Sequence, residues 1–374
     1  MKGVKGDLLF YSDFPFGFHN TEAEEKMARF AARGWRVLYV EQLGIRNPRP
    51  RHVLRALRRA RTPPRRAPFE VVSPKLLPPR RAPGVDAFNR RWLARQLLGH
   101  IGDTARTVLW VRFPTPELVP LVEGHAWRAV VYEAVDDHAA GPGLTGRLVP
   151  VLRAAEERLL ARADVVFAWS EPIRERLAVR HPNVLLATAA AELEPLEAVA
   201  EAPGEERTAV FAGALGFRFD ERLAADAARL LSDWKLVLAG PADEGATRAL
   251  AGLPNVELAG RFEHAELPAL LARAAVALIP YRRNAFTDTL VPVKLVEYLA
   301  AGRPVVSTPM RAAEGFADVV TFAAGPEAFA EAVRAAARDD SAEARRRRVE
   351  RVRPYSWNRR IDELEAAIEA AVRG

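Results

Sequence analysis

Three polar residues in one predicted helix have the types and spacing needed to bind a phosphorylated ligand. In the segment VPVKLVEYLAAGRPVV, Lys294, Glu297 and Tyr298 follow Pro292, and proline favours the first turn of a helix. A lysine there lies at the positive end of the helix, where helices bind phosphate. A carboxylate one turn later can accept hydrogen bonds from the hydroxyls of a ribose. The spacing predicts a nucleoside diphosphate site, and the alternative is an exposed Lys294–Glu297 ion pair worth about 0.2–0.5 kcal/mol.

A second group of polar residues follows a predicted strand in the first half of the chain. In VVYEAVDDHAAGPG, Asp136, Asp137 and His138 come directly after a hydrophobic run. Histidine and aspartate are common general bases in enzymes. Two alternatives stay open for the same residues, because an aspartate here can cap the following turn and adjacent aspartates can bind a metal ion.

Two loops that contain glycine also join predicted strands to helices. The loop SDFPFGFHNTEAE includes Gly17 and His19, and the loop AGALGFRF includes Gly213 and Arg218. Glycine permits a close approach of the backbone to a ligand, and amide groups at a strand-to-helix turn can face phosphate. Gly213 and Arg218 are therefore predicted phosphate contacts. The alternatives are a surface role for Arg218 and a structural role for His19.

Short hydrophobic strands alternate with helical patterns along most of the chain, and these elements must position the polar residues. The runs LLFY, RVLYV and TVLWV in the first half resemble TAVFA, KLVLA and VALIP in the second. Such alternation predicts parallel sheets with crossover helices. We therefore predict an α/β fold of two doubly wound, Rossmann-like domains facing each other across a cleft. Ligands bind such sheets at the carboxyl ends of the strands.

A polar stretch rich in proline and glycine separates the two series of strands, and it suits a linker. The predicted domains are residues 1–190, which would bind an acceptor, and residues 205–355, which would bind a nucleotide. A final helix at residues 356–374 is expected to pack back on the first domain. A chain of 374 residues is long enough for two such domains.

Composition restricts the class of protein further. Hydrophobic residues make up 49% of the chain, as in globular proteins, and cysteine is absent. The absence of cysteine excludes disulfides and thiolate metal sites and suits a reducing compartment. No apolar run reaches the roughly 18–20 residues that span a bilayer, and the first residues have too short an apolar core for a signal peptide. We expect a cytoplasmic protein without a bound metal.

The net charge of +7 is unevenly distributed, with many arginines between Arg46 and Arg95. In this region Val53, Ala56, Leu57 and Ala60 repeat at helical spacing among arginines. A basic amphipathic helix of this kind predicts contact with an anionic membrane surface, on the inner face of the membrane. A plain solvated face is the alternative. Aromatic residues are not interleaved with the basic run as a nucleic-acid surface would need, so no nucleic acid partner is expected.

Several segments resemble GT-B glycosyltransferases. YRRNAFTDTLVPVKLVEYLAAGRPVVSTP is similar to the nucleotide-binding segment of bacterial members of the retaining group that includes glycogen and sucrose synthases. VFAGALGFRFDERLAADAARLLSDWKLVLAGP and NVELAGRFEHAELPALLARAAVALIPY resemble other parts of the same domain. VVYEAVDDH, ADVVFAWSE and HPNVLLATAA resemble parts of the first domain of that family. The resemblance covers most of the chain.

The resemblance implies a nucleotide-diphosphate sugar as donor, with a UDP- or GDP-sugar expected and no further cofactor. Lys294 would neutralise the diphosphate, Glu297 would hold the ribose, and the segment containing Arg261 would pass the base. One departure concerns the donor sugar. The retaining group has a glutamate eight positions before the one that matches Glu297, and this chain has Thr289 there, with Asp288 beside it. Sugar recognition by Asp288 or by the local backbone around Thr289, or a different donor sugar, would explain the departure.

For the acceptor, the resemblance implies a base at the end of the strand before Asp136. We expect Asp136 to act first, with Asp137 and His138 as further candidates, because a strand places successive side chains on opposite sides. Gly17 and His19 would lie near the donor or the acceptor.

The predicted activity is therefore the transfer of a sugar, of the hexosyltransferase type and without a metal, to a hydroxyl of a glycan, a lipid-linked acceptor or a natural product. A GT-B-type nucleotide-sugar epimerase and a non-catalytic sugar-nucleotide-binding protein are the alternatives.

Overall fold

The computed structural model describes residues 5–17, 22–42, 67–80, 82–141 and 146–373. The chain divides into two compact units. The first comprises residues 1–169, 173–187 and 361–374, and the second comprises residues 170–172 and 188–360. The predicted contact His19 and the predicted amphipathic helix near residues 53–60 lie outside the described residues. The domain boundaries predicted from the sequence stay predictions.

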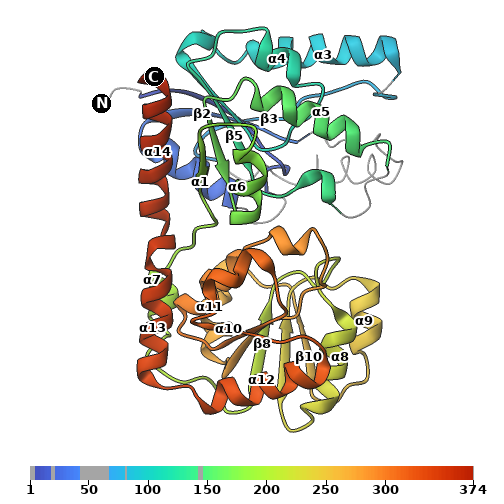
Figure 1. Cartoon of the computed structure of the whole chain (residues 1–374), viewed down its shortest axis with the longest axis vertical. Coiled ribbons are helices and arrows are strands. Elements are labelled where there is room, and N and C mark those ends of the chain that lie inside the picture. The colour runs from blue at the N-terminus through green and yellow to red at the C-terminus, as the bar shows by residue number, and fades with distance from the viewer. Residues whose placement is uncertain (1–4, 18–21, 43–66, 81, 142–145, 374) are drawn as a thin grey trace. The chain divides into compact units, whose positions relative to one another are not determined.

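The first unit is built on a seven-stranded parallel sheet with the order β3-β2-β1-β4-β5-β6-β7 (Figure 1). Central strand β1 pairs with β2 and β4, so that Leu9 lies opposite Leu38 and Leu109. These strands are hydrophobic almost throughout because both faces of a parallel sheet are buried. The strands are β1 Gly6–Tyr11, β2 Trp35–Val40, β3 Glu70–Val72, β4 Thr107–Val111, β5 Ala129–Ala134, β6 Val165–Ala168 and β7 Val184–Leu186.

Helices connect these strands. They are α1 Glu22–Ala32, α3 Pro83–Leu98, α4 Val119–Glu123, α5 Val149–Leu160 and α6 Glu171–Ala178, with the short turns η1 Thr104–Arg106 and η2 His138–Ala140. The last helix, α14 Trp357–Arg373, contributes its C-terminal part to this unit. There Glu365 accepts hydrogen bonds from Lys5 Nζ at 2.5 Å, Trp35 Nε1 at 2.8 Å and Arg33 Nη1 at 3.1 Å. These contacts hold the C-terminal helix of the chain against its first strands.

The second unit contains a six-stranded parallel sheet with the order β10-β9-β8-β11-β12-β13, which is the Rossmann order. Its strands are β8 Thr208–Ala212, β9 Lys235–Ala239, β10 Val256–Gly260, β11 Val276–Ile279, β12 Val305–Ser307 and β13 Val320–Phe322. Its helices are α7 Glu194–Glu197, α8 Glu221–Leu230, α9 Glu244–Leu250, α10 Leu267–Ala272, α11 Val293–Ala300, α12 Pro326–Arg338 and α13 Ala342–Val352. The short turns are η3 His264–Glu266, η4 Thr287–Thr289, η5 Arg311–Phe316 and η6 Arg353–Tyr355.

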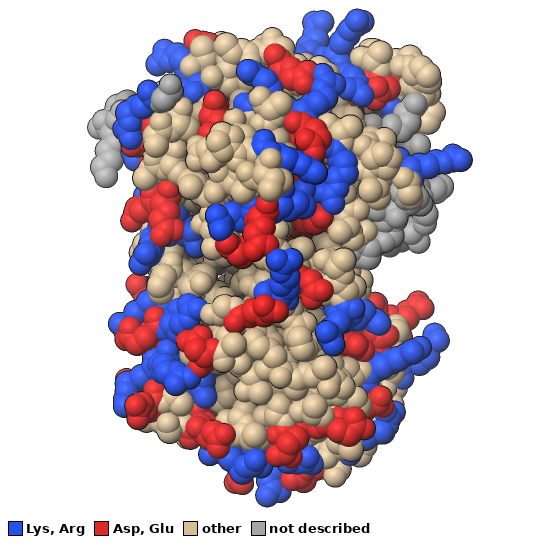
Figure 2. All heavy atoms as spheres, viewed as in Figure 1, with Lys and Arg blue, Asp and Glu red and all other residues tan. Residues whose placement is uncertain are grey.

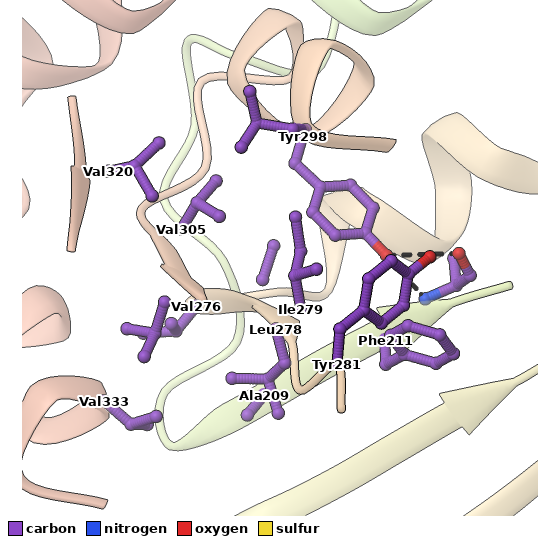
Figure 3. Packing of buried hydrophobic residues seen from close by; sticks show 14 of the residues in the cluster. Ala209, Phe211, Val276, Leu278, Ile279, Tyr281, Tyr298, Val305, Val320 and Val333 are labelled. Atoms are coloured by element: carbon purple, nitrogen blue, oxygen red, sulfur yellow. Dashed lines mark hydrogen bonds between the residues drawn. The ribbon is translucent and has the colours of Figure 1, made fainter. Parts of the chain in front are cut away.

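The core of the second unit lies between this sheet and its helices. Buried side chains of β8, β11, β12 and β13 pack with Tyr298 of α11, as Figure 3 shows; the labelled strand residues are Ala209, Phe211, Val276, Leu278, Ile279, Val305 and Val320. The predicted α/β class with two Rossmann-like parallel sheets is therefore confirmed.

Helix α11 is largely buried. Its buried residues include the polar Glu297 and Tyr298 besides Leu295, Val296 and Leu299. The reason is that α11 contacts β12 on one side and α7 and α13 on others, so that little of the helix faces solvent.

Candidate functional site

Tyr298 fixes α11 to the end of strand β8. Its hydroxyl accepts a hydrogen bond from the backbone N–H of Ala212 at 2.7 Å and lies 3.2 Å from the carbonyl oxygen of Ala212, to which it donates (Figure 3). The side chain is fully buried, and burial raises the pKa of Tyr298 well above its usual value. Tyr298 is therefore a structural tether, and it brings the first turn of α11 beside the loop that follows β8.

Lys294 occupies that first turn. Its Nζ donates a hydrogen bond to the hydroxyl of Tyr281 at 2.8 Å, and it lies 5.4 Å from the ring centre of Phe211 and 5.3 Å from that of Tyr281. Within the described part of the chain Lys294 forms no ion pair with a carboxylate, and this includes Glu297. The exposed Lys294–Glu297 ion pair considered from the sequence is thus not formed.

Gly213 makes room for this lysine. A Cβ atom built on Gly213 would lie 2.9 Å from both Cε and Nζ of Lys294, and Gly213 has a φ angle of 152°. Any larger residue would therefore meet the lysine and strain the backbone. The structure brings together Lys294 and Gly213, two residues predicted separately as phosphate contacts.

Glycines end the three neighbouring strands at the same edge of the sheet. The N–H of Gly213 donates to the carbonyl of Ala239 at 2.7 Å, and the N–H of Gly240 donates to that of Gly260 at 2.6 Å. A Cβ atom on Gly240 would lie 2.0 Å from the carbonyl oxygen of Gly213. The strand ends can approach this closely because glycine has no side chain. Gly240 was not singled out from the sequence, although it follows a strand as Gly213 does.

Glu297 is a buried carboxylate one turn after Lys294. The residue is 8% exposed, and its carboxylate accepts no hydrogen bond from the residues that the structure describes. Burial raises the pKa of Glu297 above its usual 4.5, although the nearby charges of His264 and Lys294 oppose this shift. Nε2 of the half-exposed His264 lies 3.7 Å from the carboxylate. His264 was missed from the sequence, since it lies 33 positions away in an ordinary polar turn.

Arg218, which belongs to the β8–α8 loop, lies near two aromatic rings. Its guanidinium carbon is 5.2 Å from the ring centre of Phe217 and 5.4 Å from that of Phe286. Phe217 is 55% exposed. These cation–π contacts help to hold the guanidinium in place, in the loop that contains Gly213.

The other predicted donor contacts lie in surface turns of the second unit. Asp288 and Thr289 are half-buried in η4, where the N–H of Asp288 donates to the carbonyl of Asn284 at 3.0 Å. The hydroxyl of Thr289 donates to the carbonyl of Phe286 at 2.8 Å, so this hydroxyl stabilises the turn. Arg261 is exposed directly after β10.

In the first unit, Asp136, Asp137 and His138 follow β5 as predicted, but they have different partners. Asp137 Oδ1 caps η2 by accepting from the N–H of Ala139 at 3.2 Å, and its Oδ2 accepts from Arg153 at 2.7 Å. The capping role considered from the sequence is thus found for Asp137. Asp136 is half-buried, and its backbone carbonyl accepts from the N–H of His138 at 3.0 Å.

His138 is oriented by the residue that follows β4. Its Nε2 lies 3.1 Å from the carbonyl oxygen of Arg112, and its ring lies 4.6 Å from that of Phe113. A carbonyl only accepts hydrogen bonds, so Nε2 carries the hydrogen and Nδ1 is the nitrogen left to accept a proton. Gly17 is exposed with a φ angle of 70°, and its N–H donates to Glu24 at 2.7 Å.

A buried charge cluster lies beside the carboxyl edge of the first sheet, and it was not predicted. Lys26 of α1 pairs with Glu133 of β5 and, at 2.7 Å, with Glu22. Arg112 lies 3.0 Å from Glu22, 3.4 Å from Asp13 and 3.5 Å from Glu133. We call Asp13, Glu22, Lys26, Arg112 and Glu133 the buried charge cluster. Only the spacing of Glu22 and Lys26 along a helix could have indicated it.

The pKa values of the two glutamates of the buried charge cluster shift in opposite directions, although burial raises both. Burial favours protonation of Glu133, but Lys26 and Arg112 outweigh it and lower the pKa of Glu133 to about 2. Two indole N–H groups, from Trp110 at 2.9 Å and Trp169 at 2.7 Å, also donate to Glu133. Burial raises the pKa of Glu22 above 4.5, and its basic neighbours offset only part of the increase.

Neither a metal site nor a membrane span is found in the described part of the chain. No group of three or more histidine, aspartate and glutamate side chains there is arranged to hold a metal ion. None of the described helices combines the length and the apolar character needed to cross a bilayer.

Comparison with known sequences points to one family of enzymes. Residues 206–339 match the model of the family described as glycosyl transferases group 1. TuaH of Bacillus subtilis (strain 168), a glycosyltransferase assigned to teichuronic acid biosynthesis, is 28% identical over 222 residues, which are 54% of this chain and 55% of the relative. This chain thus spans about half the length of that curated relative.

Solved structures resemble the whole chain. A glycosyltransferase from Rickettsia africae ESF-5 has a TM-score of 0.66 at 11% identity, with 99% of each chain covered. HepE of Anabaena, solved in complex with UDP and glucose, has a TM-score of 0.66 at 14% identity, covering 98% of this chain and 99% of that chain. A UDP-forming α,α-trehalose-phosphate synthase from Burkholderia vietnamiensis has a TM-score of 0.66 at 13% identity, covering 99% and 98%. The chain therefore has the GT-B fold, and the resemblance predicted from its motifs is confirmed.

Proposed function

We propose that this protein is a glycosyltransferase that moves a sugar from a nucleoside diphosphate to a hydroxyl acceptor. The observation that carries the proposal is the combination, one turn apart on α11, of a lysine and a buried glutamate that can both still bind a ligand. Lys294 has no carboxylate partner, and Glu297 is buried without accepting a hydrogen bond from the described residues. A nucleoside diphosphate would satisfy both, with its phosphates on the lysine and its ribose hydroxyls on the glutamate. The complex of HepE with UDP and glucose supports this assignment.

The diphosphate is the leaving group of the reaction, so groups that stabilise its negative charge accelerate transfer. Lys294 and the first amides of α11 would contact the phosphates, and Gly213 would let the backbone of its loop approach them. Arg218, which lies near the rings of Phe217 and Phe286 in the same loop, would be a second basic group near the phosphates. With basic side chains stabilising the negative charge of the leaving diphosphate, we propose that transfer requires no metal ion.

The remaining residues proposed to contact the donor lie in turns of the second unit. Asp288 and Thr289 would recognise the sugar, and Arg261 would lie near the base of a UDP- or GDP-hexose. The hydroxyl of Thr289 is occupied in its own turn, which favours Asp288 as the group that binds sugar hydroxyls.

Transfer forms a bond between the acceptor oxygen and the anomeric carbon while the bond from that carbon to the diphosphate oxygen breaks. The proton of the acceptor hydroxyl must pass to a base, and the nucleoside diphosphate leaves. We assign the base to Asp136 or His138. Asp137 is the less suitable candidate of the three because it caps a turn and pairs with Arg153. Gly17 and His19 would lie near the substrates.

The acceptor is a hydroxyl of a glycan, a lipid-linked intermediate or a natural product. We propose that the first domain binds it, residues 205–355 bind the donor, and the helix at 356–374 belongs with the acceptor domain. The proposed location is the cytoplasm, peripheral on the inner face of the membrane, with the region Arg46–Arg95 facing anionic lipid.

A melting-temperature panel with UDP-, GDP-, dTDP- and ADP-hexoses tests the proposal. A ligand at 100 times its dissociation constant stabilises a protein by about 2.7 kcal/mol. We expect one nucleoside diphosphate series to raise the melting temperature and the matching nucleoside monophosphate to raise it far less. Asp136→Asn should leave the shift unchanged, because Asp136 is assigned to the acceptor.

The same samples distinguish the other activities. A transferase should release nucleoside diphosphate slowly by hydrolysis when no acceptor is present, and an epimerase would convert the sugar nucleotide without releasing it. A binding protein would show the melting shift with no turnover. The absence of a shift with every nucleotide would contradict the proposal.

A further inference from the structure

Helix α3 carries two large aromatic side chains on its solvent side. Phe88 is 46% exposed and Trp92 is 40% exposed. The two rings stack, with centres 6.0 Å apart and planes inclined by 18°. Residues four apart lie on the same side of a helix, so the pair forms one continuous apolar surface. Isolated exposed aromatics need no explanation, but a stacked exposed pair is a candidate contact surface.

Leu77 is a third exposed apolar residue, and its backbone is hydrogen-bonded to helix α3. It is 52% exposed. The side-chain amide of Asn89, which is fully buried, accepts from the N–H of Leu77 at 2.8 Å and donates to its carbonyl at 2.9 Å. We call Leu77, Phe88 and Trp92 the aromatic patch. The two hydrogen bonds of the buried asparagine therefore fix the backbone of Leu77 against the helix that carries the aromatic pair.

The aromatic patch is bordered by unpaired cations. Arg91 and Arg95 are exposed and lie three and seven positions after Phe88, on the same side of α3, and Lys75 is exposed just before Leu77. None of these three forms an ion pair with a described residue. The acidic residue of α3, Asp86, is paired with Arg90 at 2.7 Å. Basic and acidic side chains are interspersed over much of the face of the molecule shown in Figure 2.

We propose that the aromatic patch and the cations around it dock on an anionic lipid surface. Aromatic rings are favoured at the depth of the lipid headgroups, where the apolar body and the polar edge are both satisfied. Arginine and lysine beside them are attracted to anionic headgroups. Neither signal alone gives stable attachment, and their combination does. The observations therefore fit a bilayer that contains acidic phospholipid.

Two arguments favour lipid over other occupants. Three apolar side chains make a surface much smaller than the roughly 800 Å² per partner of a stable protein–protein interface. The segment 43–66 of this chain carries nine arginines and no acidic residue. This segment has the same sign of charge as Arg91 and Arg95, and it would add to attraction toward an anionic membrane. The inference rests on the proposed position of the region Arg46–Arg95 at the membrane and names the contacts that would make it, and it does not depend on sugar transfer.

Cosedimentation with vesicles tests the inference. The full chain is mixed with phosphatidylcholine vesicles, or with vesicles that also contain about one-third phosphatidylglycerol, at low salt and at about 0.5 M salt. We expect binding to the anionic vesicles at low salt, little binding to the neutral ones, and loss of binding at high salt through screening. Brominated acyl chains should quench tryptophan fluorescence, and Trp92→Phe should remove the quenching, because the other six tryptophans are less exposed.

Two variants and a matched control distinguish binding through this face of α3 from a non-specific effect of net charge. Each cation near an anionic surface contributes roughly a fivefold change in affinity, so Arg91→Glu with Arg95→Glu should weaken binding at least tenfold. Phe88→Ala with Trp92→Ala should also weaken it at least tenfold. Arg106→Glu with Arg162→Glu changes the net charge equally at exposed, unpaired positions and should weaken it much less.

Absence of binding to anionic vesicles would overturn the inference. It would also be overturned if the control weakened binding as much as the Arg91 and Arg95 changes, or if the aromatic change had no effect. Unchanged melting temperatures of the variants show that they are folded. Their nucleotide-induced melting shift should be retained, and this keeps failure of lipid docking distinct from failure of the proposed transferase activity.

Discussion

Glu297 is placed where its charge destabilises the folded protein. A buried carboxylate without hydrogen-bond donors is unfavourable, and burial raises its pKa for this reason. Such a residue is retained when a ligand supplies the missing partners, which is the usual exchange of stability for function at a binding site. The pKa therefore gives a direct way to distinguish a ligand-binding Glu297 from a structural one.

Glu297→Gln is expected to raise the melting temperature of the ligand-free protein at pH 7 to 8. The folded-state pKa lies above the value of 4.5 for an unfolded glutamate, so the native state binds this proton more tightly and ionisation lowers the free energy of unfolding. The difference should disappear as the pH falls through the raised pKa toward 4.5. The variant should bind nucleoside diphosphate about tenfold more weakly or worse, since an amide accepts weaker hydrogen bonds than a carboxylate.

Calorimetric melting at several pH values and nucleotide titration measure both effects. Glu369→Gln, at an exposed position of α14, is the matched control and should change neither quantity. A fall in the ligand-free melting temperature of Glu297→Gln at neutral pH would show that the carboxylate stabilises the fold.

Gly213→Ala should displace Lys294, because the new Cβ would lie 2.9 Å from the lysine side chain at a φ angle of 152°. Strain of this kind costs about 1–3 kcal/mol. We expect a lower melting temperature and a loss of nucleotide affinity. Gly216→Ala in the same loop is the control, since a Cβ there meets nothing within 4 Å. Equal effects of the two substitutions would refute the role given to Gly213.

At the scale of elements, the site depends on the attachment of helix α11 to strand β8. The hydroxyl of Tyr298 makes this attachment through both backbone groups of Ala212. A tyrosine, rather than a phenylalanine, is needed after Glu297 because its hydroxyl satisfies both the buried N–H and the buried carbonyl of Ala212. This use of the tyrosine could not be read from the sequence, because Ala212 lies 86 positions away.

Tyr298→Phe is predicted to lower the free energy of unfolding by about 1–3 kcal/mol, since it leaves a buried N–H without a partner. It should also weaken nucleotide binding, because Lys294 and Gly213 are no longer held together. Tyr355→Phe removes a hydroxyl that makes no hydrogen bond with the described residues and should be nearly neutral. Chemical denaturation of both variants measures the difference, and equal stability would argue against the tether.

The buried charge cluster performs a similar role in the first unit, where it joins α1 to β4 and β5. Lys26→Met would leave Glu133 and Glu22 buried without their nearest cation, and breaking a buried ion pair costs about 3–5 kcal/mol. Lys5→Met removes a half-exposed lysine from Glu365 and should cost less than about 1 kcal/mol. Urea unfolding compares the two, and a small effect of Lys26→Met would contradict the assignment.

The pH dependence of the Lys26→Met effect follows from Glu133. Its folded-state pKa is lowered to about 2, compared with 4.5 in the unfolded chain. Its paired, ionised form therefore contributes stability that is complete above pH 4.5 and is lost as the pH falls toward about 2. The difference in unfolding free energy between wild type and Lys26→Met should shrink over the same range.

At the scale of the whole molecule, local signals identified the strands and the fold, and distant contacts escaped them. Alternating hydrophobic runs and helical patterns were enough to predict two parallel sheets, because the hydrophobic residues of each run indicate by themselves that the run is buried. Lys294, Glu297 and Gly213 were found since each lies at the end of a strand or the start of a helix. His264, Tyr281 and Gly240 were missed because their importance arises from neighbours far along the chain.

The central claim is that Lys294 binds the diphosphate of a nucleotide, and calorimetric titration tests it most directly. The nucleoside diphosphate identified by the melting panel is titrated into wild type, Lys294→Met and the control Lys235→Met, whose lysine is exposed at the start of β9. A hydrogen bond to a charged group contributes about 1.5–3 kcal/mol, so Lys294→Met should bind roughly ten- to hundredfold more weakly, with its ligand-free melting temperature nearly unchanged. Lys235→Met should bind like wild type. Wild-type affinity in Lys294→Met would contradict the account.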